Sequence, residues 1–354
     1  MKIKVCYVFR SHKTVVPTRS DLINELGTIK ALAQFAQVYC HNKLFILQEG
    51  RFVVQKKLPR KYDVYVVRDH PTFSSRVLKR GAPLLMAGVP FRPNLFRRIE
   101  RTKNSRITVY TEAWKQILNT GRGIPKFNDK GHKFQRVVCI YQTLQEYLSP
   151  QQESEITADI RDSFEGNFIV GHFGRFTRKS QPDLFAKAWR ILCDKYDGLR
   201  FVCSRGDPRQ GLNRKRERQI ERLQYLKNIE HSQMPYYLSA CDITFEPFTH
   251  QWWEVTGSLK TKESAACGTP FVTASSAARG LEFGRDYELF IPKKCFRDHH
   301  EQTNVDRLVH LISRLVEDDE WRQGISERLA QRAKFFSIEE SGKRLKKIVE
   351  GVLG

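Results

Sequence analysis

The chain has 354 residues, of which 40% are hydrophobic, and it carries a formal net charge of +22. This length exceeds what one hydrophobic core usually organises, so it predicts two domains. No apolar run reaches the roughly 18 residues that a membrane span needs. The N-terminal MKIKVCYVF also lacks the apolar core and cleavage site of a signal peptide. The expected location is therefore the cytoplasm, either free or peripheral on the cytosolic membrane face.

The charge is concentrated in the first part of the chain. Residues 1–150 hold 28 Lys and Arg against 9 Asp and Glu, a net charge of +19, whereas residues 151–354 hold 33 against 30, a net charge of +3. An excess of this size goes beyond the needs of solubility and predicts an anionic partner for the first half. The eight cysteines are scattered without a CxxC pair, which favours free core thiols over disulfides or zinc.

Strand-like runs alternate with helical stretches along the first half. The spacing of apolar residues predicts a helix over 22–36, and a short basic helix is predicted over 94–103. Residues 119–136 are rich in glycine and charge and predict a long loop. Further strands are predicted at 2–9, 64–67, 82–88 and 106–110.

The alternation continues after a domain seam predicted near 148–165. An amphipathic helix is predicted over 183–196, a helix passing into a strand over 234–248, and a charged helical stretch over 304–334. Strands are predicted at 168–174 and 199–204. Strands that alternate with helices predict an α/β protein with parallel sheets.

Residues 256–270, TGSLKTKESAACGTP, are the most informative segment. A Thr-Gly-Ser turn opens a predicted helix on which Lys260 and Glu263, three residues apart, share one face. Unpaired amides at a helix start and a nearby lysine suit a diphosphate, and a carboxylate one turn further on suits the hydroxyls of a ribose. The segment therefore predicts a site for a nucleotide-activated group. The alternative is an ordinary surface ion pair beside a helix-to-strand turn.

Five segments in the same order and spacing resemble the GT-B glycosyltransferases, and specifically the retaining group 1 enzymes, also called family 4. They are RITVYTEAWKQIL (106–118), GHFGRFTRKSQPDLFAKAWRIL (171–192), YLKNIEHSQMPYYLSACDITFEPF (225–248), TGSLKTKESAACGTPFVTA (256–274) and FSIEESGKRLKKIVEGVL (336–353). The resemblance implies two Rossmann-like domains facing across a cleft. It assigns residues 1–148 to an acceptor domain and 149–335 to a nucleotide-sugar domain. Residues 336–354 would form a C-terminal helix that packs back towards the acceptor domain.

The resemblance also implies roles for individual residues. Arg175 and Lys179 match the pair that neutralises the donor diphosphate without a metal or other cofactor, and Glu263 matches the glutamate that binds the ribose. Gly174 would let the backbone approach the phosphates. The turn and first helical residues that match the diphosphate loop are Thr256, Gly257, Ser258, Leu259 and Lys260. A plain basic loop remains the alternative for Arg175 and Lys179.

The sequence departs from the family pattern at two places. Many relatives carry a first glutamate eight residues before the second, but this chain has Val255 there, preceded by Glu254. Relatives also often carry a histidine after the strand at 82–88, where this chain has Gly-Val-Pro. The candidates for that missing catalytic histidine are His12, Asp69 and His70, of which His70 is preferred. His172, before the Gly-Arg turn, either faces the donor or is a buried structural histidine.

The basic first half leaves the acceptor open among several classes. Residues 90–103, PFRPNLFRRIERTK, predict a basic amphipathic helix that can lie on an anionic bilayer, or one whose apolar face simply packs on the sheet. An anionic acceptor, either a membrane glycolipid or a cell-surface polysaccharide precursor, fits this charge. The alternatives are a DNA base modified by sugar transfer and a non-catalytic basic binding module. The joint presence of Arg175, Lys179, Lys260 and Glu263 argues against the non-catalytic module.

Overall fold

The computed structural model divides the chain into two compact units. Unit 1 combines Met1–Glu146 with Phe336–Gly354, and unit 2 is Tyr147–Phe335. The residues that the structure describes are 3–9, 20–40, 45–48, 51–54, 61–68, 71–87, 93–121, 132–144, 154–174, 182–204, 220–226, 229–246, 255, 257–292 and 301–354.

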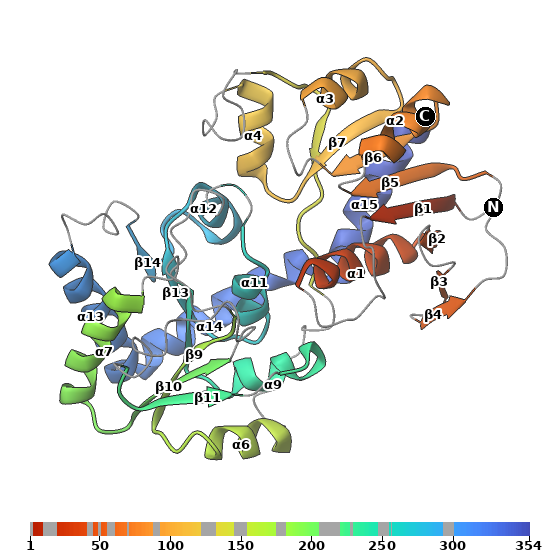
Figure 1. The fold of residues 1–354 in the computed structure, drawn as a ribbon. Coiled ribbons are helices and arrows are strands. Elements are labelled where there is room, and N and C mark those ends of the chain that lie inside the picture. Colours follow the sequence, from red (N-terminus) through yellow and green to blue (C-terminus); the bar gives the residue numbers. More distant parts are fainter. Residues whose placement is uncertain are drawn as a thin grey trace. The chain divides into compact units, whose positions relative to one another are not determined.

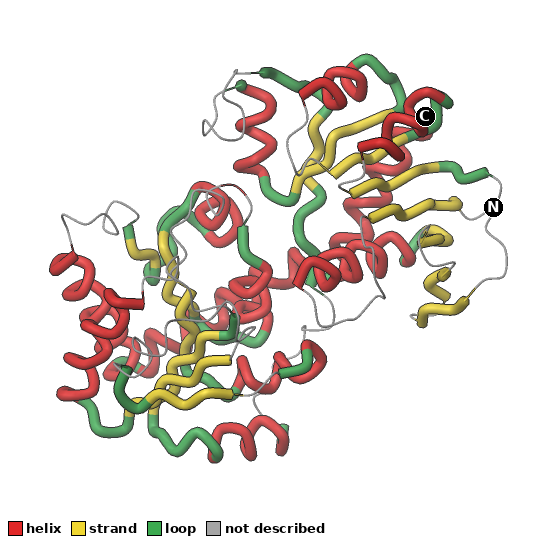
Figure 2. Tube along the Cα trace, viewed as in Figure 1, coloured by secondary structure: helices red, strands yellow, loops and turns green. Residues whose placement is uncertain are grey.

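Unit 1 is built on a largely parallel sheet (Figures 1 and 2). In its described part the strand order is β4-β3-β2-β1-β5-β6-β7-β8, and only β3 and β4 run antiparallel to their neighbours. The strands are β1 (Ile3–Phe9), β2 (Ala36–Cys40), β3 (Phe45–Gln48), β4 (Arg51–Val54), β5 (Val64–Arg68), β6 (Leu84–Ala87), β7 (Ser105–Val109) and β8 (Val137–Cys139). Because β1 pairs with β2 on one side and β5 on the other, the sheet has its switch point between β1 and β5.

The core of unit 1 includes the last helix of the chain. The helices described here are α1 (Ser20–Ala33), α2 (Pro71–Lys79), α3 (Pro93–Glu100), α4 (Glu112–Thr120) and α15 (Ile338–Leu353). Helices α1 and α15 pack side by side (Figure 1). Leu345, Val349 and Val352 of α15 are buried in one cluster with Val5 and Val38 of the sheet. Unit 1 therefore draws part of its core from a segment that follows unit 2 in the sequence.

Helix α3 lies within residues 90–103 and follows the alternative in which its apolar residues pack on the sheet. Leu95, Phe96 and Ile99 are buried, and the helix packs against β7. Arg97 and Arg98 remain exposed. The apolar side chains of α3 are therefore covered by the protein itself, while these two cations stay accessible.

Unit 2 holds a fully parallel sheet in its described part, with the order β11-β10-β9-β12-β13-β14. The strands are β9 (Phe168–His172), β10 (Leu199–Ser204), β11 (Leu223–Leu226), β12 (Ile243–Glu246), β13 (Phe271–Ala274) and β14 (Phe290–Ile291). The helices are α6 (Glu155–Asp162), α7 (Pro182–Lys195), η2 (His231–Gln233), α9 (Met234–Ser239), α11 (Leu259–Ala266), α12 (Ala277–Phe283), α13 (Glu301–Glu317), α14 (Asp319–Ala333) and η5 (Lys334–Phe336), the last crossing into unit 1. The predicted α/β class with two Rossmann-like units is confirmed.

One local expectation was wrong at its end. The predicted helix over 22–36 ends at Ala33, because Ala36 already begins strand β2. The stretch over 304–334 is helical as predicted and consists of α13 and α14, because the side chain of Asp318 caps α14 by accepting a hydrogen bond from the Trp321 amide at 2.9 Å. The two units divide between Glu146 and Tyr147, next to the seam predicted near 148–165, and helix α6 lies within that range.

Seven cysteines in the described part of the chain are buried, and none of them forms a disulfide. Burial raises the pKa of Cys6 and of Cys40 to about 12, which keeps both thiols protonated at neutral pH. Among the described helices, none combines the length and the hydropathy that crossing a membrane requires.

Candidate functional site

The start of α11 lies against the turn that follows strand β9. Gly174 has a φ of +149°, and a Cβ at this position would overlap the ammonium group of Lys260. Only glycine allows that approach. The N-cap residue Ser258 makes no side-chain hydrogen bond to the first amides, and the first turn of α11 holds no acidic residue. The positive end of the helix and the Lys260 ammonium therefore lie at the Gly174 turn together.

Glu246 is the counter-ion of Lys260. It is the last residue of β12 and is 2% exposed, and its Oε1 lies 3.8 Å from the Lys260 Nζ. Burial raises the pKa of the Glu246 carboxyl, while the charges of Lys260 and Arg279 oppose that rise and the carboxylate of Glu263 adds to it. Glu246 and Gly174 follow the neighbouring strands β12 and β9, so they lie at the carboxyl edge of the sheet, at its switch point. Open α/β sheets bind their ligands at such a point.

Glu263, one turn further along α11, is held by a histidine. The Nε2 atom of His231, the first residue of η2, lies 2.8 Å from Glu263 Oε1. The side chains of His231 and Glu263 are only 17% and 7% exposed. Lys260 and Glu263 thus present a cation and a histidine-bound carboxylate one turn apart on the same helix.

A buried ion pair lies beneath the turn that leads into α11. The Nζ of Lys262 is 2.8 Å from Glu282 Oε1, and both side chains are almost completely buried. Lys262 also donates to the carbonyl of Ser258 at 3.3 Å. The Glu282 carboxylate fills the space of a Cβ at Gly257, whose φ is +64°. The turn at 257–258 is therefore held in place by Lys262 and Glu282, whose charged groups are buried.

The structure brings some predicted site residues together and does not describe others. Gly174, Gly257, Ser258, Leu259, Lys260 and Glu263 lie at or next to the start of α11, as set out above. His172 is completely buried, and its Nδ1 lies 2.7 Å from the carbonyl of Phe245, so it joins β9 to β12 as the structural alternative expected. Seven residues lie outside the described part of the chain: Arg175, Lys179, His70, Thr256, His12, Asp69 and Glu254.

The position that matches the family's first glutamate is buried. Val255 is 1% exposed. A carboxylate at this position would need a buried partner.

Sequence reasoning missed His231, Glu246 and the pair of Lys262 with Glu282. Glu246 could have been found, because a carboxylate at the end of a buried parallel strand lies where α/β sheets bind ligands. His231 lies within a quoted motif but 32 residues before its partner. No local signal pairs Lys262 with Glu282.

Unit 1 has a charged cluster at its own switch point. Arg68, the last residue of β5, forms an ion pair with the buried Glu25 of α1. Arg68 contacts the Oε1 atom of Glu25, and the Tyr110 hydroxyl lies 3.4 Å from the same atom. The hydroxyl of Tyr7, in β1, donates a hydrogen bond to Glu25 Oε2. The Arg68 guanidinium also stacks 5.2 Å from the centre of the Tyr110 ring. The Arg68 side chain is 22% exposed and contacts Glu25 and the ring of Tyr110.

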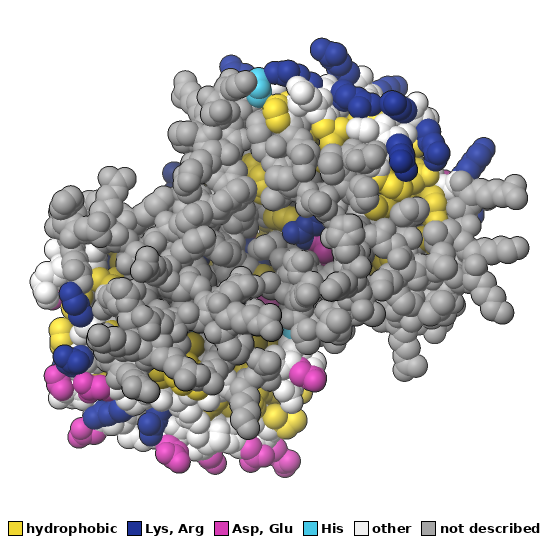
Figure 3. All heavy atoms as spheres, in the orientation of Figure 1, with side chains coloured by type: hydrophobic (Ala, Val, Ile, Leu, Met, Phe, Trp, Pro, Cys, Tyr) yellow, Lys and Arg dark blue, Asp and Glu magenta, His cyan; other side chains and the backbone are white. Residues whose placement is uncertain are grey.

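Helices α2 and α3 carry a continuous set of cations. On the face shown in Figure 3, Lys and Arg side chains gather over these two helices, which are in contact. We call this set the basic α2–α3 surface; its exposed members are Arg76, Lys79, Arg80, Arg97, Arg98, Arg101 and Lys103. Its positive charges add to those of the unit that holds most of the net charge, and such a field attracts anions.

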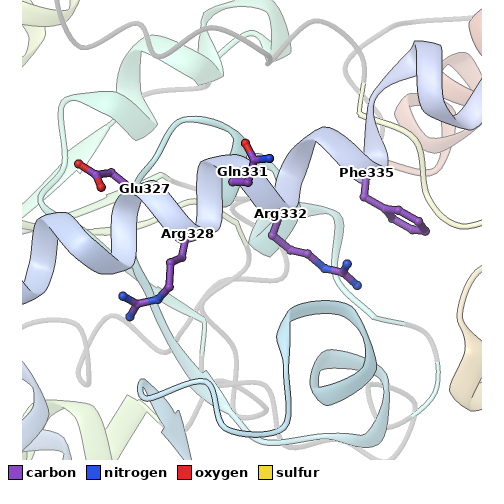
Figure 4. Close-up of a pocket in the computed structure, with 5 residues that line it drawn as sticks. All are labelled: Glu327, Arg328, Gln331, Arg332 and Phe335. Atoms are coloured by element: carbon purple, nitrogen blue, oxygen red, sulfur yellow. The ribbon is translucent and has the colours of Figure 1, made fainter.

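Unit 2 also has an open groove of about 630 Å³ along α14. It is lined by Glu327, Arg328, Gln331, Arg332 and Phe335. Figure 4 shows Arg328 and Arg332 extending from the same side of the helix. Arg328 pairs with Glu288 at 2.5 Å, and the Nε of Arg332 donates to the carbonyl of Glu282 at 2.5 Å. Both arginines are thus engaged in holding α14 to its neighbours.

Residues 167–318 match the family model described as glycosyl transferases group 1. These residues include the Gly174 turn, His231, Glu246 and the whole of α11. No curated protein matches the sequence.

Solved structures of glycosyltransferases share the fold along nearly the full chain. HepE of Anabaena, in complex with UDP and glucose, is 15% identical with a TM-score of 0.68, covering 98% of this chain and 99% of that one. Sucrose-phosphate synthase of Thermosynechococcus elongatus is 13% identical with a TM-score of 0.67, covering 98% of each chain. The pneumococcal O-GlcNAc transferase GtfA, in complex with UDP and GlcNAc, is 15% identical with a TM-score of 0.59, covering 90% of this chain and 67% of that one. Residues 167–318 therefore match the group 1 glycosyltransferase model, and the chain has the GT-B fold of two Rossmann-like units that these solved structures share.

Proposed function

We propose that the chain transfers a sugar from a nucleotide-sugar donor to a hydroxyl group of an anionic acceptor. The acceptor is a membrane glycolipid or a cell-surface polysaccharide precursor, and the reaction retains the anomeric configuration and needs no metal ion. Unit 2 holds the donor and unit 1 holds the acceptor.

The observation that carries the donor proposal is the contact of Lys260 with Gly174. It places an ammonium group, the start of α11 and a side-chain-free turn at one point, which suits a diphosphate. Glu263 lies one helical turn further on and on the same face, so its carboxylate is close enough to accept hydrogen bonds from a ribose next to that diphosphate. The UDP in the HepE and GtfA complexes supports a nucleoside diphosphate as the leaving group.

The chemistry follows from the charge of the leaving group. As the bond between sugar and phosphate breaks, the diphosphate gains negative charge, and fixed cations beside it lower the barrier. Lys260 and the start of α11 supply part of this stabilisation. Arg175 and Lys179, directly after the Gly174 turn in the sequence, supply the rest, and His70 is the candidate acceptor-side group. Retention and metal independence rest on the family resemblance.

The anionic acceptor is supported by two features of unit 1. The basic α2–α3 surface offers cations that attract an anionic lipid headgroup or polysaccharide at about 1 kcal/mol each. The Arg68 cluster places a guanidinium at the switch point of the sheet, directly before the segment that holds Asp69 and His70. A planar guanidinium suits a phosphate or carboxylate.

Donor hydrolysis across a panel of UDP-, GDP- and ADP-sugars tests the donor half of the proposal. At least one donor should be hydrolysed without added metal and in the presence of EDTA. Arg175→Ala and Lys179→Ala should each lower turnover by about 10² to 10³-fold, with melting temperatures close to that of the unchanged protein. Near-normal turnover in both variants would reject the assignment of the diphosphate site.

Binding to anionic liposomes and to duplex DNA at two salt concentrations tests the acceptor half. Binding to vesicles that contain anionic lipid, and transfer of sugar to an extracted glycolipid fraction, would support the proposal. Tight, salt-dependent binding to DNA together with transfer to a hydroxymethylated base would replace it. If none of the nucleoside diphosphates raises the melting temperature of the protein, a non-catalytic role is favoured instead.

A further inference from the structure

The pairing of His231 with Glu263 carries information about the nucleotide that the site accepts. His231 begins η2, just before α9, and Glu263 lies in α11. Their Nε2 and Oε1 atoms are 2.8 Å apart. Because the two residues are 32 positions apart, this contact exists only in the folded unit, where α9 packs against α11.

The contact engages one oxygen of the Glu263 carboxylate. Among the residues that the structure describes, His231 is the sole hydrogen-bond partner of this carboxylate. A carboxylate has acceptor sites on both oxygens, so the second oxygen is available to a ligand. Glu263 is only 7% exposed, and a carboxylate this buried needs more than one donor to be satisfied.

The direction of that second oxygen is restricted by the first contact. A side chain with one oxygen bound loses most of its rotational freedom, so the other oxygen is held ready for a donor. His231 donates through a protonated Nε2, which is present in one neutral tautomer and in the imidazolium. The orienting effect therefore does not require the histidine to be charged.

The groups near Glu263 indicate which hydrogen-bond donors of a ligand would reach its second carboxylate oxygen. Lys260 and the Gly174 turn lie one helical turn before Glu263 and mark the diphosphate end of the site. The next chemical group along a nucleoside diphosphate is the ribose, whose 2′ and 3′ hydroxyls are hydrogen-bond donors.

We propose that His231 is a positioning residue that fixes Glu263 for a ribose diol, and that the pair makes the site select ribonucleotide donors over 2′-deoxyribonucleotide donors. This inference rests on the proposed function. A 2′-deoxy donor removes one of the two hydroxyls, and a carboxylate held in a fixed direction is then left partly unsatisfied in a buried place. An unfixed carboxylate would turn to the remaining hydroxyl or to water and would discriminate weakly.

Calorimetric titration with UDP and with 2′-deoxyuridine diphosphate tests the inference. These two ligands differ by a single hydroxyl, so the contributions of the base and the diphosphate to the binding free energy cancel in the comparison. The unchanged protein should bind UDP about 10 to 100-fold more tightly, as expected for a hydrogen bond to a charged group. His231→Ala should reduce this preference to about threefold or less, mainly by weakening UDP. His231→Gln, which keeps a donor, should retain part of the preference.

Two further variants sharpen the result. Glu263→Gln should lose the preference as His231→Ala does, and the double variant should lose no more, because both residues act through one contact. His310→Asn, which changes an exposed histidine on α13 of the same unit, should keep the full preference. Melting temperatures measured for each variant separate loss of selectivity from loss of folding.

The outcomes distinguish the inference from the proposed function. Equal binding of UDP and its deoxy analogue by the unchanged protein overturns the inference and leaves the donor proposal intact. Equal weakening of both ligands by His231→Ala also overturns it, because the histidine would then support the fold and not the ribose contact. If no ribonucleoside diphosphate binds the unchanged protein, the proposed function itself fails.

Discussion

The two lysines of α11 lie two residues apart and have opposite environments. Lys260 is 32% exposed, touches the Gly174 turn and lies 3.8 Å from its acidic partner Glu246. Lys262 is completely buried and lies 2.8 Å from Glu282, which is 1% exposed. Both charges are near the positive end of the helix, where cations are unfavourable. Within one turn of α11, the partly exposed Lys260 can reach a ligand, whereas the buried Lys262 fixes the turn at 257–258.

The largest predicted effect is on stability, and it follows from breaking the buried pair of Lys262 with Glu282. Lys262→Met leaves the Glu282 carboxylate buried without its closest cation, which costs about 3–5 kcal/mol of unfolding free energy. Urea unfolding followed by tryptophan fluorescence measures the loss. Lys260→Met is the matched control on the same helix and should cost about 1 kcal/mol or less, because its pair is longer and partly exposed.

Adding Glu282→Gln to Lys262→Met should restore much of the lost stability, since the neutral amide no longer needs a buried cation. If Lys262→Met and Lys260→Met destabilise the protein equally, the contrast between the two faces of α11 is wrong.

The next effect concerns turnover. Lys260→Met removes a fixed cation from the proposed diphosphate site and should lower donor hydrolysis by about 10²-fold, about 2.7 kcal/mol of barrier, at nearly unchanged stability. A coupled assay of released nucleoside diphosphate measures it. Lys260→Arg keeps the charge and should recover part of the rate. Full activity in Lys260→Met would show that this lysine serves only as the partner of Glu246.

The smallest effect is a pH dependence of stability. Burial raises the pKa of Glu246 in the folded protein above its usual value near 4.5. The folded state then holds the proton more tightly, so this group favours folding at low pH and loses that contribution as the pH rises through its folded pKa. Glu246→Gln removes the titration, so its stability relative to the unchanged protein should rise as the pH increases above 4.5.

Unfolding curves at several pH values check this prediction. Glu282, whose pKa is also raised by burial, keeps part of the slope in the variant. Stability curves that run parallel for the two proteins would mean that Glu246 titrates alike in the folded and unfolded states.

The sequence predicted the α/β class because strand-forming runs and helical stripes recur along the chain. It misplaced the end of one helix, at Ala36, and did not divide the helical stretch over 304–334. Ala36 continues the apolar spacing of α1 but is recruited by pairing with Ile3 of β1. Asp318 reads as part of a charged helix, yet its side chain caps the next one. In both places a contact made in the folded chain overrides the local pattern.

The site was predictable only along one helix. Lys260 and Glu263 could be placed on one face because helical spacing alone decides it. His231, Glu246 and Glu282 reach α11 from other elements, and their distance along the sequence carries no signal without a strand order. The family resemblance named the segments of the candidate site but could not supply the partners that differ from one chain to the next.

The return of α15 to unit 1 has a consequence for biosynthesis. Leu345, Val349 and Val352 complete the hydrophobic cluster of Val5 and Val38 only after all of unit 2 has been translated. Nascent chains that stop short of α15 leave part of this cluster, including residues of α1, uncovered and exposed to chaperones, while Tyr147–Phe335 is already available to fold. The segment synthesised first is therefore the last to mature.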